Sequence, residues 1–319
     1  MKFYIIDAFT ENLFGGNPAG VVILDDGAAF PSDQTMVQTA AELRYSETAF
    51  IKQTSEKEFI IRYFTPVAEV DLCGHATIGS FVALLAEGRI SENGEYNNNT
   101  LAGKLNIKLQ NGFIMMDMAS PQFIAKIDTK EAIERLYSTM GLTYEPIIAQ
   151  SSCSEYTSLL PTIISTGLPD IILPVANRQQ LTAISPDFPA LSKLSEEYGV
   201  VGVHAFTLDC DTPKVTAHCR NFAPLYDIDE EAATGTANGA LTYYLFLSGL
   251  ISNGSNTDGR ECLFIQGESM ARPSKIYSHI SPIVEPSKIP DAAVAEGLSN
   301  VRIQVGGTGV ILATGDIHI

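Results

Sequence analysis

Two short segments of the chain carry side chains that suit proton transfer and anion binding. In the first, an imidazole follows a glycine turn; its residues are Cys73, Gly74 and His75. In the second, hydroxyls and a carboxylate surround a glycine; its residues are Glu231, Thr234, Gly235, Thr236 and Ala237. An imidazole can donate or accept a proton near neutral pH. Both segments precede apolar runs and are predicted to begin helices, whose unpaired N–H groups can hold a carboxylate.

Simpler structural roles for these residues stay open on the sequence alone. His75 could cap its own helix, and Cys73 could be a small buried residue. The acidic stretch around Glu231 is also typical of an ordinary helix beginning, where negative charge is favourable.

The two apolar helices that follow these segments repeat one pattern. Residues 76–86 and 237–247 are apolar or small around nearly the whole helix circumference, which predicts two helices buried in a core. At an offset of 161 residues, Gly74 matches Gly235 and Gly88 matches Gly249. Upstream, the motif Arg-x-Phe-x-Pro of 62–66 recurs at 220–224. The alternative explanation is chance similarity of two apolar helices, and the shared upstream motif argues against it.

The duplication, together with short β-rich runs between turn signals, predicts an α+β fold of two pseudo-symmetric domains. Each domain would be a curved β-sheet or barrel wrapped around one central buried helix. We place the domains at residues 1–119 and 120–319, with the last strand able to return to the first domain. The beginnings of the two buried helices are expected to face a common cleft, where a small carboxylate would bind between the domains.

Composition narrows the classes of partner. The 319 residues include 20 basic and 37 acidic side chains, a formal charge of −17, which disfavours nucleic acid and anionic membrane surfaces. The five cysteines are scattered without a C-x-x-C pair, so we expect free thiols. The five histidines show no zinc-binding spacing, so we predict no metal site. Asp7 and Glu11 interrupt the apolar N-terminus, and we expect the protein to stay in the cytoplasm.

Several motifs, spread over nearly the whole chain and in a fixed order, resemble those of the phenazine-biosynthesis PhzF-like family. They are Asp-Ala-Phe-Thr at 7–10, Gly-Asn-Pro-Ala at 16–19, Ser-Glu-Thr-Ala-Phe at 46–50, Arg-Tyr-Phe-Thr-Pro at 62–66, Cys-Gly-His-Ala-Thr at 73–77, Ser-Thr-Gly-Leu-Pro at 165–169, Ala-Thr-Gly-Thr-Ala at 233–237, Gln-Gly at 266–267 and Arg-Pro-Ser at 272–274. The resemblance implies a fold like that of diaminopimelate epimerase, a homodimer, and isomerisation without a cofactor. It also implies that a glutamate relays a proton within the substrate.

The resemblance gives individual residues roles. Glu47 matches the family's catalytic glutamate, and we expect burial in a cleft to raise its carboxyl pKa toward neutrality. His75 and Glu231 are the other candidate catalytic residues. Asn17 lies in a turn that lines the family's cleft, so it is a candidate substrate contact, as are Cys73, Gly74, Thr234, Gly235, Thr236 and Ala237.

This chain departs from the family's pattern in the second segment. Glu231 stands where the family more often has aspartate, and its extra methylene puts the substrate contact there in doubt. Thr236 replaces a serine but keeps the hydroxyl.

Three functions follow as alternatives. The first is a PhzF-like isomerase acting on a small unsaturated amino- or hydroxy-carboxylic acid. The second is an amino-acid racemase or epimerase that uses Cys73. In related thiol racemases a second cysteine faces the first, but here the matching residue is Thr234, so one arm of a two-thiol mechanism is missing. The third is a catalytically weak binder of a small metabolite, because a fold alone never establishes activity.

Overall fold

The computed structural model describes residues 1–150, 156–252, 259–283 and 301–319. They form two compact units. Unit 1 comprises residues 1–117, 270–275 and 306–319, and unit 2 comprises residues 118–269 and 276–305. The strands β18 and β19 each contribute residues to both units. No helix within the described ranges is long and apolar enough to cross a membrane.

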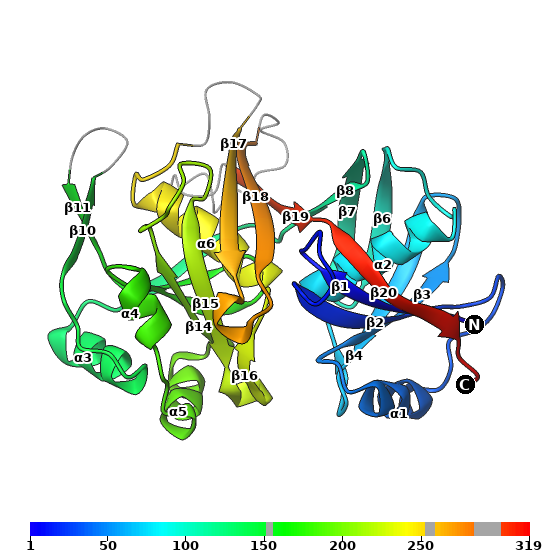
Figure 1. Cartoon of the computed structure of the whole chain (residues 1–319), viewed down its shortest axis with the longest axis horizontal. Coiled ribbons are helices and arrows are strands. Elements are labelled where there is room, and N and C mark those ends of the chain that lie inside the picture. The colour runs from blue at the N-terminus through cyan, green and yellow to red at the C-terminus, as the bar shows by residue number, and fades with distance from the viewer. Residues whose placement is uncertain (151–155, 253–258, 284–300) are drawn as a thin grey trace. The chain divides into compact units, whose positions relative to one another are not determined.

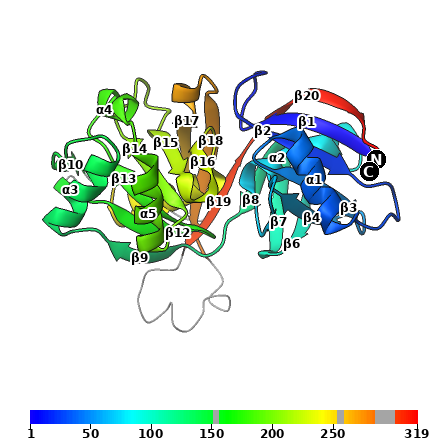
Figure 2. The same cartoon turned by 90° about the horizontal axis from the view of Figure 1, so that it is seen from below.

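Unit 1 is a curved set of strands around the helix α2, Gly74–Ala86 (Figures 1 and 2). Its remaining elements are β1 Lys2–Ala8, β2 Asn17–Ile23, α1 Asp33–Leu43, β3 Thr48–Gln53, β4 Glu58–Phe64, β5 Glu69–Val70, β6 Gly94–Thr100, β7 Gly103–Gln110, β8 Phe113–Asp117 and β20 Gly309–Asp316. Helix α2 is buried along most of its length and packs against β1 and β2, with Gly79 on that face. A Cβ at Gly79 would lie 3.6 Å from Ile6 Cβ and 3.7 Å from Ala19 Cβ.

Unit 2 repeats this plan around the helix α6, Gly235–Leu247 (Figure 1). Its remaining elements are β9 Gln122–Lys126, α3 Lys130–Thr139, β10 Ile147–Gln150, β11 Tyr156–Leu159, β12 Thr162–Ser165, β13 Pro169–Pro174, α4 Arg178–Ala183, α5 Phe188–Tyr198, β14 Gly202–Thr207, β15 Ala217–Ala223, β16 Ile228–Glu231, β17 Arg260–Gln266, β18 Ser274–Pro282 and β19 Val301–Gly307, with short 3₁₀ turns at Pro224–Tyr226 and Glu268–Met270. Eleven of the 13 residues of α6 are buried, so this helix lies inside a core as its composition predicts.

Strand pairing follows the same order in both units. In unit 1, β1 pairs antiparallel with β2, β2 parallel with β3, and β3 antiparallel with β4. In unit 2, β12 pairs antiparallel with β13, β13 parallel with β14, and β14 antiparallel with β15. Next, β4 pairs antiparallel with β5 and parallel with β6, as β15 does with β16 and β17. The predicted α+β architecture of two pseudo-symmetric domains around central helices is confirmed.

The duplicated Arg-x-Phe motif has the same contacts in each unit. The Arg62 guanidinium lies 5.1 Å from the ring centroid of Phe64 and donates two hydrogen bonds to Glu69 on β5. In unit 2, the Arg220 guanidinium lies 4.9 Å from the Phe222 ring and donates two hydrogen bonds to Glu230 on β16, both 2.8 Å long. Equivalent contacts at equivalent strand positions identify the two motifs as copies of one structural unit.

Candidate active site

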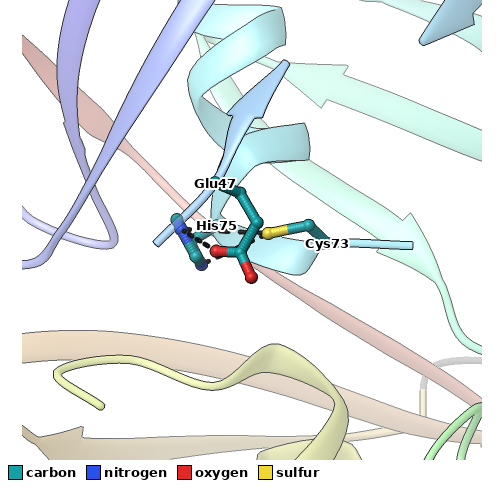
Figure 3. Close-up of side chains that lie close together, drawn as sticks. All are labelled: Glu47, Cys73 and His75. Carbon is teal, nitrogen blue, oxygen red and sulfur yellow. Dashed lines mark hydrogen bonds and ion pairs between the residues drawn. The ribbon is translucent and has the colours of Figure 1, made fainter. Parts of the chain in front are cut away.

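Three side chains of unit 1 converge at the beginning of α2 (Figure 3). Glu47 immediately precedes β3, Cys73 is the N-cap residue of α2, and His75 lies in its first turn. Glu47 Oε2 lies 3.2 Å from His75 Nε2, and Cys73 Sγ lies 3.4 Å from His75 Nδ1. All three side chains are buried, with Glu47 8% exposed. The structure therefore brings the predicted proton relay and the predicted imidazole into direct contact.

Two further side chains fix the imidazole. The Asn17 side-chain amide lies 3.1 Å from His75 Nδ1, and Ser46 Oγ lies 3.3 Å from His75 Nε2. Asn17, predicted as a substrate contact, therefore contacts a candidate catalytic side chain. Ser46 was not predicted as a site residue, although it precedes Glu47 in the motif of residues 46–50. These contacts engage both ring nitrogens and hold the imidazole of His75 in one orientation.

The expectation of a raised pKa for Glu47 is wrong for this structure. Burial acts to raise the pKa of Glu47, but the hydrogen bond and positive charge of His75 outweigh it, so the pKa lies below its ordinary value. Burial acts to lower the pKa of His75, but Cys73 and Glu47 raise it well above its ordinary value. The resting pair is therefore a carboxylate beside an imidazolium, and Glu47 is ready to accept a proton.

Cys73 is in the wrong state for thiol chemistry. Burial and the Glu47 carboxylate raise the pKa of the Cys73 thiol to about 11, so it stays protonated at neutral pH. Glu47, Cys73 and His75 offer ligand atoms within 4.8 Å of one another, a spacing that could hold a metal ion. The predicted absence of a metal stays a prediction. Cys73, Cys210, Cys219 and Cys262 are free thiols, and Cys153 lies outside the described residues.

An ion pair between distant parts of the sequence holds the turn that carries Asn17. The Arg272 guanidinium donates to Asp7 Oδ1 at 2.6 Å and to the carbonyl oxygens of Gly15 and Gly16 at 2.8 and 2.9 Å. The other carboxylate oxygen of Asp7 accepts the backbone N–H of Phe14 at 2.8 Å. This clamp fixes the residues directly before Asn17, so Arg272 is a positioning residue for the Asn17–His75 contact.

Replacing Arg272 by Lys should lower kcat about 10- to 100-fold and change KM little. A lysine cannot supply the forked donors that hold two carbonyls and a carboxylate, and small misplacements of catalytic groups reduce rates strongly. Steady-state kinetics over a range of pH would measure this effect. Arg89→Lys is the matched control, because Arg89 has a similar exposure, 22% against 26%, and binds Asp26 and Gln53 instead. Equal losses in both variants would contradict the positioning role.

In unit 2, the second predicted segment forms a hydrogen-bonded network at the beginning of α6. Thr234 is the N-cap residue, and its hydroxyl donates a short hydrogen bond to the Glu231 carboxylate. The Gln266 side chain accepts from Thr234 N at 3.2 Å and from Asn238 Nδ2 at 2.8 Å, and donates to Glu231 O at 2.7 Å. Gln266, from the Gln-Gly motif of residues 266–267, and Asn238 thus support this turn, although neither was predicted as a site residue.

The structure gathers the predicted site residues into two groups. Unit 1 brings together Asn17, Glu47, Cys73, Gly74 and His75. Unit 2 brings together Glu231, Thr234, Gly235, Thr236 and Ala237. Thr236 is 8% exposed, and its carbonyl accepts a 2.9 Å hydrogen bond from the Thr166 hydroxyl. That both groups serve one substrate stays a prediction.

The chain is similar in sequence to several known proteins. The sequence pattern of the PhzC-PhzF family, described as phenazine biosynthesis-like protein, matches residues 6–315. A protein of Deinococcus radiodurans named uncharacterized isomerase is 33% identical over 316 residues, which cover 97% of this chain and 92% of that protein. The trans-2,3-dihydro-3-hydroxyanthranilate isomerase of Pseudomonas fluorescens is 29% identical over 325 residues and 99% of both chains.

Solved structures agree on the fold. A Bacillus anthracis protein described as a phenazine biosynthesis protein of the PhzF family superposes with a TM-score of 0.80 at 26% identity, covering 100% of this chain and 99% of that chain. A probable proline racemase from Agrobacterium radiobacter superposes with a TM-score of 0.61 at 11% identity, covering 100% of this chain and 93% of that chain. The second likeness concerns the fold alone.

Proposed function

Because the chain belongs to the PhzC-PhzF phenazine biosynthesis-like family, we propose that it is an isomerase that shuttles a proton within a small unsaturated amino- or hydroxy-carboxylic acid. Glu47 is the group that removes and returns the proton. The observation that carries this proposal is the 3.2 Å contact between the buried Glu47 carboxylate and His75. A carboxylate held in its basic form by an adjacent imidazolium suits the first step of such a reaction.

The proposed reaction is a closed cycle of two proton transfers. The Glu47 carboxylate takes a proton from one substrate carbon, and the electron pair of the broken C–H bond enters the conjugated system. The positive charge of His75 stabilises the negative charge that develops on the substrate. The Glu47 carboxyl then gives the same proton to a second carbon, and the double bonds shift. Atoms and electrons balance without an oxidant or a reductant, so the reaction needs no cofactor.

The relatives and the unit 2 turn indicate the class of substrate. The Pseudomonas fluorescens relative is named for a dihydro-hydroxyanthranilate, a cyclic acid with amino and hydroxyl substituents. Backbone N–H groups at the beginning of α6, from Gly235 to Ala237, can bind a carboxylate, and the Thr236 hydroxyl can add a hydrogen bond. We propose that this turn binds the substrate carboxylate and that the protein works as a homodimer in the cytoplasm.

The test is an isomerisation assay on the purified protein after dialysis against a chelator. Trans-2,3-dihydro-3-hydroxyanthranilate and related unsaturated amino and hydroxy acids would be followed by proton NMR. We expect at least one to rearrange to a product of the same mass without any added cofactor. Tight binding of these acids without turnover would contradict the proposal and favour the metabolite-binding alternative.

The racemase alternative depends on Cys73, and its protonated, buried thiol argues against it. Alkylating Cys73 or replacing it by Ser would decide between the isomerase and the racemase. A racemase activity that disappears with the thiol would overturn the isomerase assignment.

A further inference from the structure

Unit 2 contains a buried carboxyl group that none of the motifs above includes. Asp170 is the second residue of β13 and is 2% exposed. Its carboxylate accepts a hydrogen bond from the Gly202 backbone N–H. Among the residues that the structure describes, no lysine, arginine or histidine forms an ion pair with it. A carboxyl group that is buried without a cation is costly to keep, so a role for it is worth seeking.

The strand register shows where Asp170 lies in the duplicated plan. In unit 1, Thr48 pairs with Gly20 on one side and with Phe64 on the other. In unit 2, Val203 pairs with Ile171 and with Phe222, the copy of Phe64. Thr48 and Val203 are therefore equivalent positions. It follows that Gly202 is the counterpart of Glu47, and Asp170 is the counterpart of Ala19.

The two units thus carry the acidic residue on different strands of the equivalent strand pair. In unit 1, the acid is Glu47, which immediately precedes β3 and lies beside the small Ala19 on β2. In unit 2, Asp170 on β13 pairs directly with Gly202. Position 202 cannot hold a carboxylate side chain, because a Cβ there would lie 2.0 Å from the Phe222 carbonyl oxygen. Asp170 supplies a carboxyl group next to the position from which Glu47 acts in unit 1.

On this geometry we propose that Asp170 is the acid/base group of unit 2, a carboxylic acid that donates a proton to a substituent oxygen or nitrogen of the substrate. The inference rests on the proposed function. When Glu47 removes a carbon-bound proton, the substrate gains a negative charge, and the Asp170 proton neutralises it by forming an O–H or N–H bond. When Glu47 protonates the second carbon, Asp170 takes its proton back. Both residues end the cycle as they began it.

The surroundings keep Asp170 in the acid form. Burial and the negative charge of Glu231 raise the pKa of Asp170 to about 8, so the group is a proton donor at neutral pH. Its strand partners on β12 and β14 are Ile164 and Gly202, which carry no charge. Helix α6, which packs against β13, contributes only Tyr243 and Tyr244 as ionisable side chains. Glu231 is therefore the charge that acts on Asp170.

Asp170→Asn tests the proposal because it keeps the shape and removes the proton. In the wild type, kcat should fall as pH rises through about 8, as Asp170 loses its proton. The variant should lose this alkaline limb and turn over about 100-fold more slowly at pH 7. Thr242→Val is the matched control, since it removes a buried 2.7 Å hydrogen bond to Ser278 in the same unit and should keep the alkaline limb.

Infrared difference spectroscopy gives a readout without turnover. Subtracting the spectrum of Asp170→Asn from that of the wild type at pH 6 should show the C=O band of a protonated carboxylic acid, which disappears above pH 9. Absence of the band would overturn the Asp170 assignment alone. A band with an unchanged pH–rate profile in the variant would overturn its catalytic role. Full activity of Glu47→Gln would instead overturn the proposed function, and the acid/base step with it.

Discussion

Glu47→Gln should lower kcat by about 1,000-fold or more while the protein stays folded. Glutamine has nearly the shape of glutamate and can still accept a hydrogen bond from His75, but it cannot take up and return a proton. Removing a general acid/base group typically costs 100- to 10,000-fold, and here one group performs both transfers. The measurement is kcat on the substrate identified by the isomerisation assay, with the unfolding midpoint recorded in parallel.

Glu58→Gln is the control for this substitution. Glu58 belongs to the same unit but pairs with Lys104 on the surface, where its side chain is 34% exposed. It should keep the wild-type kcat. An active Glu47→Gln variant would contradict the proton-relay role, and an inactive Glu58→Gln variant would show that the loss is not specific to the site.

His75→Gln should also have a large effect, which acts through the pKa of Glu47. Without the imidazolium, burial dominates and raises the pKa of Glu47 above its ordinary value of 4.5. The acidic limb of the pH–rate profile should move to higher pH, because Glu47 must be ionised to start the cycle. Loss of charge stabilisation should lower kcat about 100-fold at the optimum.

The same substitution should reduce stability in a defined pH window. Glu47 has a lowered pKa, so its contribution is present at neutral pH and is lost as pH falls through that pKa, below 4.5. His75 has a raised pKa, so its contribution is lost as pH rises through that pKa, above 6.5. The difference between wild type and variant in the free energy of unfolding should be largest between these limits, at about 3–5 kcal/mol, the usual cost of breaking a buried ion pair.

His204→Asn is the matched control for the histidine. His204 is equally buried, but burial lowers its pKa to about 4, so it is neutral at the pH of these measurements. Its replacement should not move the acidic limb. If chemical denaturation gave the same stability loss for His75→Gln at every pH, the ion pair would not exist as described.

The fold followed from local patterns in the sequence. Apolar residues around the whole circumference of α2 and α6 require burial on all sides, and the copied Arg-x-Phe motif leads to copied ion pairs with Glu69 and Glu230. Such features depend on residues close in the chain. The family motifs likewise pointed to Glu47 and His75 before any contact between them was known.

Features that depend on distant residues escaped the sequence analysis. The Arg272–Asp7 clamp joins residues 265 positions apart, and only the fold brings them together. The lowered pKa of Glu47 arises from His75, 28 positions along the chain, and burial alone gave the wrong direction. The position of Asp170 in the duplicated plan follows from strand register, which pairs it with Gly202. A one-residue change in that register would move its side chain to the other face of the sheet.

A label-transfer experiment tests the central claim most directly. Substrate carrying deuterium at the migrating position would be converted by the wild-type enzyme in ordinary water, and the product of the first turnovers analysed by NMR. Because Glu47 is buried, with 8% of the residue exposed, its carboxyl group should exchange slowly with solvent, and we predict deuterium at the newly protonated carbon. A product with only solvent hydrogen at that carbon would contradict transfer by a single sheltered carboxyl group.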